Sequence, residues 1–181
     1  MKKTIAESMP IPEKVQVKIE HGLFSATGPK GEVKRAFRTP RISLEVKGNQ
    51  VEILSKDATR REKKMLYTTR AHINNMLRGV VTPIVYKVKV LSGHFPMNIT
   101  IKGEELSVKN FLGEKFPRTL KLTKGVDVKF ADNILTVTGC DIEKVGQVAA
   151  SMEQLTRITN RDRRIFQDGL FIIEKDGVPI E

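Results

Sequence analysis

Apolar and polar residues alternate along most of this chain, which predicts a protein built largely from short strands. In the first half, the segments 15–19, 42–46 and 51–53 carry an apolar residue at every second position. A period of two puts those residues on one face of a strand, so that the face can be buried. The Gly-Pro-Lys-Gly run at 28–31 predicts a turn between strands, and Lys-Gly-Asn-Gln at 47–50 predicts the turn of a hairpin.

The same pattern begins again after Pro83. Tyr86, Val88 and Val90 alternate with lysines, and Asp-Asn at 132–133 predicts another hairpin turn. The strands predicted in this half lie at 86–90, 99–101, 106–108, 120–122, 126–128 and 135–137.

Two segments instead have the three- and four-residue spacing of an amphipathic helix. The first is predicted to begin after Asp57, as N-cap, and to end near Leu77; the second begins after the cap Asp141. The predicted buried stripes are Met65, Leu66, Thr69, Ile73, Met76, Leu77 and Val80 in the first helix, and Ile142, Val145, Val148, Ala149, Met152 and Leu155 in the second.

Both halves show the same order of strands, turns, helix cap and helix. Asn49 and Asp57 correspond to Asn133 and Asp141 at a common offset of 84 residues. The interpretation is an α+β fold with an internal duplication, in which two small antiparallel sheets are each backed by one α-helix. The predicted division is a loose N-terminal extension at 1–9, a first lobe at 10–82, a second lobe at 83–174 and a C-terminal tail at 175–181.

Charge narrows the choice of partner. The 181 residues carry a net charge of +11, which favours a polyanion such as nucleic acid. Residues 1–82 hold 17 basic and 8 acidic side chains, whereas residues 83–181 hold 15 and 13. The first half therefore has a diffuse positive charge. A membrane partner is not expected, because no stretch of about 18 apolar residues and no signal pattern occurs.

Residues capable of chemistry do not form a recognisable catalytic or metal site. His21, His72 and His94 have no second histidine three or four positions away, and Cys140 is the only cysteine. The loop at 28–31 resembles part of a phosphate loop but lacks its spacing and its Lys-Ser/Thr ending. We therefore expect no catalytic residues, no metal, no cofactor, no small-molecule substrate and a cytoplasmic location.

The second half concentrates its positive charge in one segment, 157–169, which comes after the second predicted helix. Four arginines fall within eight residues, at positions 157, 161, 163 and 164, before a Gln-Asp-Gly turn. A guanidinium can hold a phosphate with two parallel hydrogen bonds, which an ammonium cannot do. Aromatic residues make up only 6% of the chain, so phosphate contact with structured RNA is favoured over base stacking. A solvated charged loop is the alternative interpretation.

Five motifs occur in an order that resembles a known family. They are Ala-His-Ile-Asn-Asn-Met at 71–76, Ser-Gly-His-Phe-Pro-Met at 92–97, Asn-Phe-Leu-Gly-Glu-Lys at 110–115, Val-Gly-Gln-Val-Ala-Ala at 145–150 and Arg-Asp-Arg-Arg-Ile-Phe-Gln-Asp-Gly at 161–169. Together they resemble the large-subunit ribosomal protein L-six family in its archaeal form, akin to the eukaryotic L-nine. The resemblance covers about 10–178, and residues 1–9 do not align.

The resemblance implies a ribosomal protein with two copies of one α+β fold that binds 23S-type rRNA mainly through its second lobe. It also implies a place near the subunit interface, at the base of the acidic stalk, with neighbouring ribosomal proteins as partners and translation factors nearby. The implied rRNA contacts are Arg157, Arg161, Arg163, Arg164 and Gln167, with Lys115 and Arg118 beside them. Weaker candidates lie on the first helix: Arg60, Arg61, Lys63, Lys64 and Arg70.

Two other functions stay open at this point. A free-standing RNA-binding or RNA-chaperone module would have the same charge and the same arginine segment, without stable association with ribosomal subunits. An enzyme would require a cavity in the fold that unites His94 with carboxylates.

Overall fold

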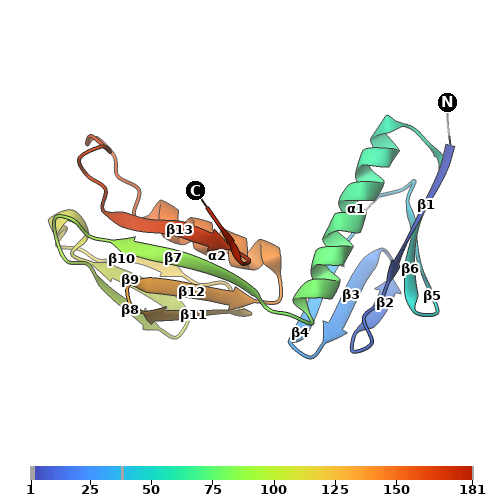
Figure 1. Cartoon of the computed structure of the whole chain (residues 1–181), viewed down its shortest axis with the longest axis horizontal. Coiled ribbons are helices and arrows are strands. Elements are labelled where there is room, and N and C mark those ends of the chain that lie inside the picture. Colours follow the sequence, from blue (N-terminus) through green and yellow to red (C-terminus); the bar gives the residue numbers. More distant parts are fainter. Residues whose placement is uncertain (1–2, 38, 181) are drawn as a thin grey trace. The chain divides into compact units, whose positions relative to one another are not determined.

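The computed structural model describes residues 3–37 and 39–180, and it confirms the α+β class. The chain divides into two compact units, Met1–Pro83 and Ile84–Glu181, so the division falls one residue from the predicted one. Figure 1 shows one long helix in the first unit, and in the second unit a shorter helix that lies along a sheet. Neither helix in the described part of the chain is long and apolar enough to cross a membrane.

The described residues of the first unit form six antiparallel strands and one helix. Strand β1 pairs with β6, and β6 pairs with β5; β2, β3 and β4 form a second sheet in chain order. The elements are β1 (Lys3–Pro10), β2 (Gln16–Glu20), β3 (Leu23–Gly28), β4 (Gly31–Ala36), β5 (Ser43–Lys47), β6 (Gln50–Ala58) and α1 (Arg60–Gly79).

The second unit repeats this order and this pairing, and then adds two strands. Strand β7 pairs with β12 and β12 with β11, while β8, β9 and β10 form a three-stranded sheet. Strands β13 and β14 extend the main sheet along the second edge of β7. The elements are β7 (Ile84–Leu91), β8 (Asn98–Lys102), β9 (Glu105–Lys109), the short 3₁₀ turn η1 (Phe111–Gly113), β10 (Arg118–Lys121), β11 (Val126–Ala131), β12 (Ile134–Gly139), α2 (Ile142–Leu155), β13 (Gly169–Lys175) and β14 (Val178–Pro179).

Each unit thus holds two sheets, where the sequence predicted one sheet per lobe. The reason is that the three-stranded meander in each unit hydrogen-bonds only within itself. The alternating pattern identifies strands correctly but carries no information on which strands pair, because pairing depends on contacts between distant segments.

The predicted boundaries of the two lobes are wrong at both ends of the chain. Residues 3–9, expected to belong to a loose extension, form most of β1 and pair with β6 along nearly their whole length. Met9 and Ile11 are buried, which anchors the segment. At the other end, Val178 and Pro179 pair with β13, so the predicted tail is part of the sheet. Residues 1, 2 and 181 lie outside the described residues.

Helix α1 begins two residues later than predicted, because Thr59 rather than Asp57 is the N-cap. The Thr59 hydroxyl oxygen accepts from the Arg61 N–H, and the Glu62 carboxylate accepts from the Thr59 N–H at 3.0 Å, which completes a capping box. The hydroxyl and the backbone N–H of Thr59 both donate to the Glu62 carboxylate, and these bonds lower the pKa of Glu62 to about 2. Asp57 has a positive φ and lies within β6, one residue before the strand ends at Ala58.

The predicted helical stripes form most of the two cores. On α1, six of the seven stripe residues are buried, whereas Met65 is exposed. On α2, the predicted cap Asp141 accepts from the Glu143 N–H at 3.0 Å, which confirms that prediction. The buried face of α2 packs on β7, β12 and β13 and consists of Val145, Val148, Ala149 and Met152.

Candidate nucleic-acid interface

Three loops meet at one end of the second unit. They are the β7–β8 loop (92–97), the β9–β10 loop (110–117) and the α2–β13 loop (156–168), which contains the arginine segment. Figure 1 shows them at the end of the unit where β7 finishes and β10 and β13 begin. Residues from all three loops contact one another, so the arginines rest on a braced surface and not on an isolated loop.

A buried carboxylate joins the arginine loop to the β7–β8 loop. The side chain of Asp168 accepts from the backbone N–H groups of Gly93 and His94, the latter at 3.0 Å, and lies 2.5 Å from Nδ1 of His94. Burial raises the pKa of Asp168, but the two backbone N–H groups and the His94 ring together outweigh it and lower the pKa below its usual value. The loop is therefore held at its C-terminal end by an ionised side chain.

An aromatic stack adds a second connection between the same loops. The Phe166 ring lies on the His94 ring, with centroids 4.7 Å apart and planes inclined by 21°. The guanidinium carbon of Arg161 lies 4.8 Å from the centroid of Phe166. A cation held against an aromatic ring has a restricted position. Arg161 is thus placed at the surface by a chain of ring contacts that leads back to Asp168.

Arg118 connects the β9–β10 loop to the end of α2. Its guanidinium forms a two-pronged pair with Glu114, at 2.8 and 2.5 Å, and donates to the Leu155 carbonyl at 2.8 Å. It also lies 4.4 Å from the centroid of the buried Phe111 ring. The bond from Arg118 lowers the pKa of Glu114. Because these contacts occupy its donors, Arg118 acts first as a brace, and its predicted rRNA contact stays a prediction.

Arg164 and Gln167 of the arginine loop are exposed. Arg164 pairs with Asp162 at 2.7 Å, and this hydrogen bond lowers the Asp162 pKa, yet 90% of the Arg164 side chain is exposed. An exposed pair of this kind contributes little to stability, because water and salt screen it, so a phosphate can replace the carboxylate. Gln167 donates to the Arg164 carbonyl at 3.2 Å.

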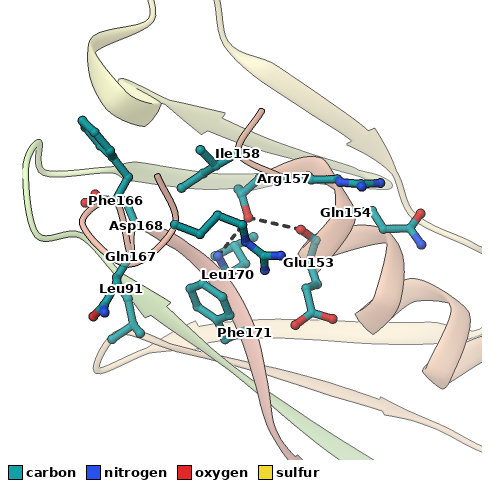
Figure 2. A pocket seen from close by; sticks show the side chains of 12 residues that line it. Leu91, Glu153, Gln154, Arg157, Ile158, Phe166, Gln167, Asp168, Leu170 and Phe171 are labelled. Atoms are coloured by element: carbon teal, nitrogen blue, oxygen red, sulfur yellow. Dashed lines mark hydrogen bonds between the residues drawn. The ribbon is translucent and has the colours of Figure 1, made fainter. Parts of the chain in front are cut away.

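Arg157 and Arg163 border a cavity of about 450 Å³ beneath the loop. Figure 2 shows the side chains that line it, and its dashed lines mark hydrogen bonds between these residues. The Thr156 hydroxyl donates to the Glu153 carbonyl and accepts from the Leu170 N–H at 2.9 Å. The lining residues are Leu91, Glu153, Gln154, Thr156, Arg157, Ile158, Arg163, Phe166, Gln167, Asp168, Leu170 and Phe171.

The basic residues predicted on the first helix belong to the other unit. Arg60, Arg61, Lys63 and Lys64 are exposed on the first turns of α1. Arg70 pairs with Glu7 of β1 at 3.3 Å. The structure therefore brings together the C-terminal arginines, Gln167, Lys115 and Arg118. It does not bring the α1 set to the same unit.

Sequence reasoning missed the residues that hold the interface in place. Among the three histidines, His94 was considered only as a metal or catalytic residue, and Asp168 only as part of a turn. Their contact spans 74 positions, which no local pattern reveals. Both residues do fall within motifs that carry the family resemblance. No group of three His, Cys, Asp or Glu side chains suited to a metal ion occurs among residues 3–37 and 39–180.

Comparison with known proteins gives consistent results along almost the whole chain. The family model described as Ribosomal protein L6 matches residues 11–82 and 95–169. The chain is 44% identical to the large ribosomal subunit protein uL6 of Nanoarchaeum equitans, over 96% of this chain and 94% of the relative. It is 40% identical to the uL6 protein of Methanosarcina mazei, over 97% and 99%, and 38% identical to that of Methanobrevibacter smithii, over 95% and 97%.

Proposed function

The chain belongs to the ribosomal protein L6 family, and on this premise we propose that it anchors itself to 23S-type rRNA through the three-loop end of its second unit. Its relatives are named as proteins of the large ribosomal subunit, so its role is that of a structural ribosomal protein in the cytoplasmic ribosome. The family is structural and not enzymatic. The rRNA contacts we propose are Arg157, Arg161, Arg163, Arg164, Gln167 and Lys115, with Arg118 as a brace that can also reach the RNA.

One observation carries the proposal: exposed arginines are mounted on a loop that buried contacts hold in place. Asp168 and the Thr156 hydroxyl hold the two ends of the loop, and the Phe166 ring, two residues before Asp168, adds a stacking contact with His94. A solvated charged loop, the alternative interpretation, needs none of these contacts. A binding segment benefits from them, because the loop loses less conformational freedom when RNA binds.

The proposed mechanism is neutralisation of phosphates. Each contact releases counterions from the RNA, so affinity depends steeply on salt concentration. With about six phosphate contacts, affinity falls roughly a thousandfold between 50 and 200 mM salt. Arg161 and Arg163 contribute by their charge and by two-pronged geometry, which lysine cannot reproduce.

The test replaces Arg161, Arg163 and Arg164 by alanine and measures affinity for a large-subunit rRNA transcript of Methanosarcina mazei over a range of salt concentrations. The magnitude of the slope of log affinity against log salt should decrease by about three. The matched control replaces Lys121, Lys124 and Lys129, which are exposed in the same unit, and removes the same charge. If both triple variants bind alike, general attraction explains the binding and the proposed anchor is wrong.

A place at the stalk base near the factor-binding region is a further part of the proposal, and it rests on the family resemblance. Neighbouring ribosomal proteins and translation factors would then lie within reach of the chain. Cross-linking from Cys140 and from single cysteines introduced on α1, within assembled subunits, would identify the neighbours. Cross-links only to proteins and rRNA remote from the stalk would contradict this location.

The two other functions can be separated from this one. A free-standing RNA chaperone would not sediment with large subunits from cell extract, whereas a subunit protein would. The enzyme alternative required a cavity that unites His94 with carboxylates. The cavity contains Glu153 and Asp168, but His94 is not among its lining residues and its ring is stacked on Phe166.

A further inference from the structure

The β9–β10 loop exposes an aromatic ring that the fold does not use. Phe116 is 85% exposed, more than any other large hydrophobic side chain among the described residues. On the neighbouring arginine loop, Ile165 is 64% exposed. Both residues lie on loops of the proposed rRNA interface. Single exposed apolar residues are common on proteins, so exposure alone does not indicate a function.

The turn that precedes Phe116 is held by specific contacts. Asn110 and Leu112 both have left-handed backbones, with φ of 61° and 47°, which is unfavourable for a residue as bulky as leucine. The buried ring of Phe111 and the bond from the Asn110 amide to the Pro96 carbonyl, at 3.0 Å, hold this turn. The pair between Glu114 and Arg118 joins the residues on either side of Phe116 in the sequence.

The surroundings of Phe116 are basic. Lys115 precedes it, and Arg118 lies two positions later. The one acidic residue of the loop, Glu114, is paired with Arg118 and is also close enough to Arg161 for that charge to lower its pKa. An apolar ring within a positively charged border matches a partner that has a flat apolar face and an anionic backbone. An unpaired nucleotide has both.

We infer that Phe116 stacks on an unpaired base of the RNA bound by the arginine loop, and that Ile165 makes a second apolar contact with the same RNA. This inference rests on the proposed function and adds a base contact to its phosphate contacts. The low aromatic content of the chain disfavours binding of a long single strand, which requires many aromatic rings, but it does not disfavour a contact with one base. One ring on a fixed loop suffices to hold a single base.

The absence of tryptophan from the chain provides a direct test. Phe116→Trp introduces a single fluorophore, whose emission should be strongly quenched when the Methanosarcina mazei large-subunit rRNA transcript binds. The matched control is Phe130→Trp on β11, where the native side chain is 41% exposed. Its emission should change little at the same saturation.

Affinity measurements complete the test. Phe116→Ala should lower the affinity for the transcript by roughly ten- to a hundredfold, because stacking on one aromatic ring contributes about that much. The salt slope should stay that of the wild type, since no charge is removed. Phe116→Tyr should retain the affinity, and Phe116→Leu should lose most of it although it keeps the apolar volume. Unchanged thermal unfolding of Phe116→Ala checks that the fold is intact.

The outcomes distinguish the inference from the function on which it rests. If Phe116→Ala binds the transcript like the wild type and Phe116→Trp is not quenched, the inference is overturned while the arginine anchor stands. If Phe116→Ala impairs incorporation into subunits but not affinity for RNA, the ring contacts a protein and the inference is equally overturned. If the wild-type protein itself does not bind the transcript, the proposed function fails first.

Discussion

The two units share an order of elements and a pattern of strand pairing, yet they differ in the segment that comes after the helix. In the first unit, α1 ends at Gly79 and the chain continues after Pro83 into the next unit. In the second, α2 leads into the arginine loop and then into β13, which pairs with one edge of β7. The corresponding edge of β1 in the first unit pairs with no strand among the described residues. The added strand gives the loop a fixed end.

The two units also differ in net charge, and the unit that contains the arginine loop is the less basic one. The first unit carries a net charge of +9 and the second only +2, but the second unit holds the mounted arginines. Net charge sets the general attraction to a polyanion, whereas local geometry decides which side chains meet it. We therefore expect the less basic unit to be the anchor.

The largest effect is expected from breaking equivalent cores in the two units. Phe24→Ala in the first unit and Phe111→Ala in the second should each lower the free energy of unfolding by about 3–5 kcal/mol, because both rings are buried. Only Phe111→Ala should also weaken rRNA binding, since Phe111 supports the β9–β10 loop and Arg118. Denaturant unfolding measures the loss of stability, and rRNA affinity is measured at a temperature at which both variants stay folded. If both variants lost rRNA affinity equally, the second unit would not be the specific anchor.

A smaller effect is expected from the carboxylate that fixes the arginine loop. Asp168→Ala leaves the N–H groups of Gly93 and His94 without their acceptor and should cost about 1–3 kcal/mol of unfolding free energy. It should also weaken rRNA binding without a change in the salt slope, because every arginine is retained. Asp168→Asn keeps one acceptor oxygen, so its stability and its rRNA affinity should lie between those of the wild type and Asp168→Ala. A variant with normal affinity would show that the loop needs no such anchor.

The basic residues of α1 should contribute less to rRNA affinity than the arginine loop does. Replacing Arg60, Arg61, Lys63 and Lys64 by alanine should reduce affinity for the rRNA transcript by about tenfold or less, through the loss of general attraction. The three-arginine variant serves as the comparison, although it removes one charge fewer. A larger loss in the α1 variant would move the anchor to the first unit.

The smallest effects concern the two helix caps. Thr59→Ala and Asp141→Ala should each cost about 1 kcal/mol of unfolding free energy. The first cap also depends on pH, because the folded-state pKa of Glu62 is about 2, below its ordinary value of 4.5. Glu62 therefore stabilises the fold above pH 4.5, and this contribution is lost as the pH falls towards 2. Melting of the wild type and Glu62→Gln should differ at pH 6 and converge near pH 2, because glutamine can still cap the helix but carries no charge. A difference that stays constant with pH would contradict the stabilisation by ionised Glu62.

Much of the secondary structure can be predicted from the sequence, because it depends on neighbours one to four positions apart. The alternation at 86–90 and 135–137 predicts strands that the structure contains, and Asp141 caps α2 as expected. The signal for the true cap of α1 was also present, as Thr59 with Glu62 three positions later. The arginine segment is visible in the same way, as a local concentration of one residue type.

Tertiary structure alone decided which segments meet. Strand β1 is hidden in the sequence because Glu7 interrupts its apolar face, and the partners of Glu7, Tyr67 and Arg70, lie 60 or more positions away on α1. The contact of Asp168 with His94 likewise joins residues 74 positions apart. Sequence patterns identify which side chains can bind a polyanion, but only packing between distant segments fixes the positions that those side chains take, because the energy that holds them comes from buried contacts no local pattern contains.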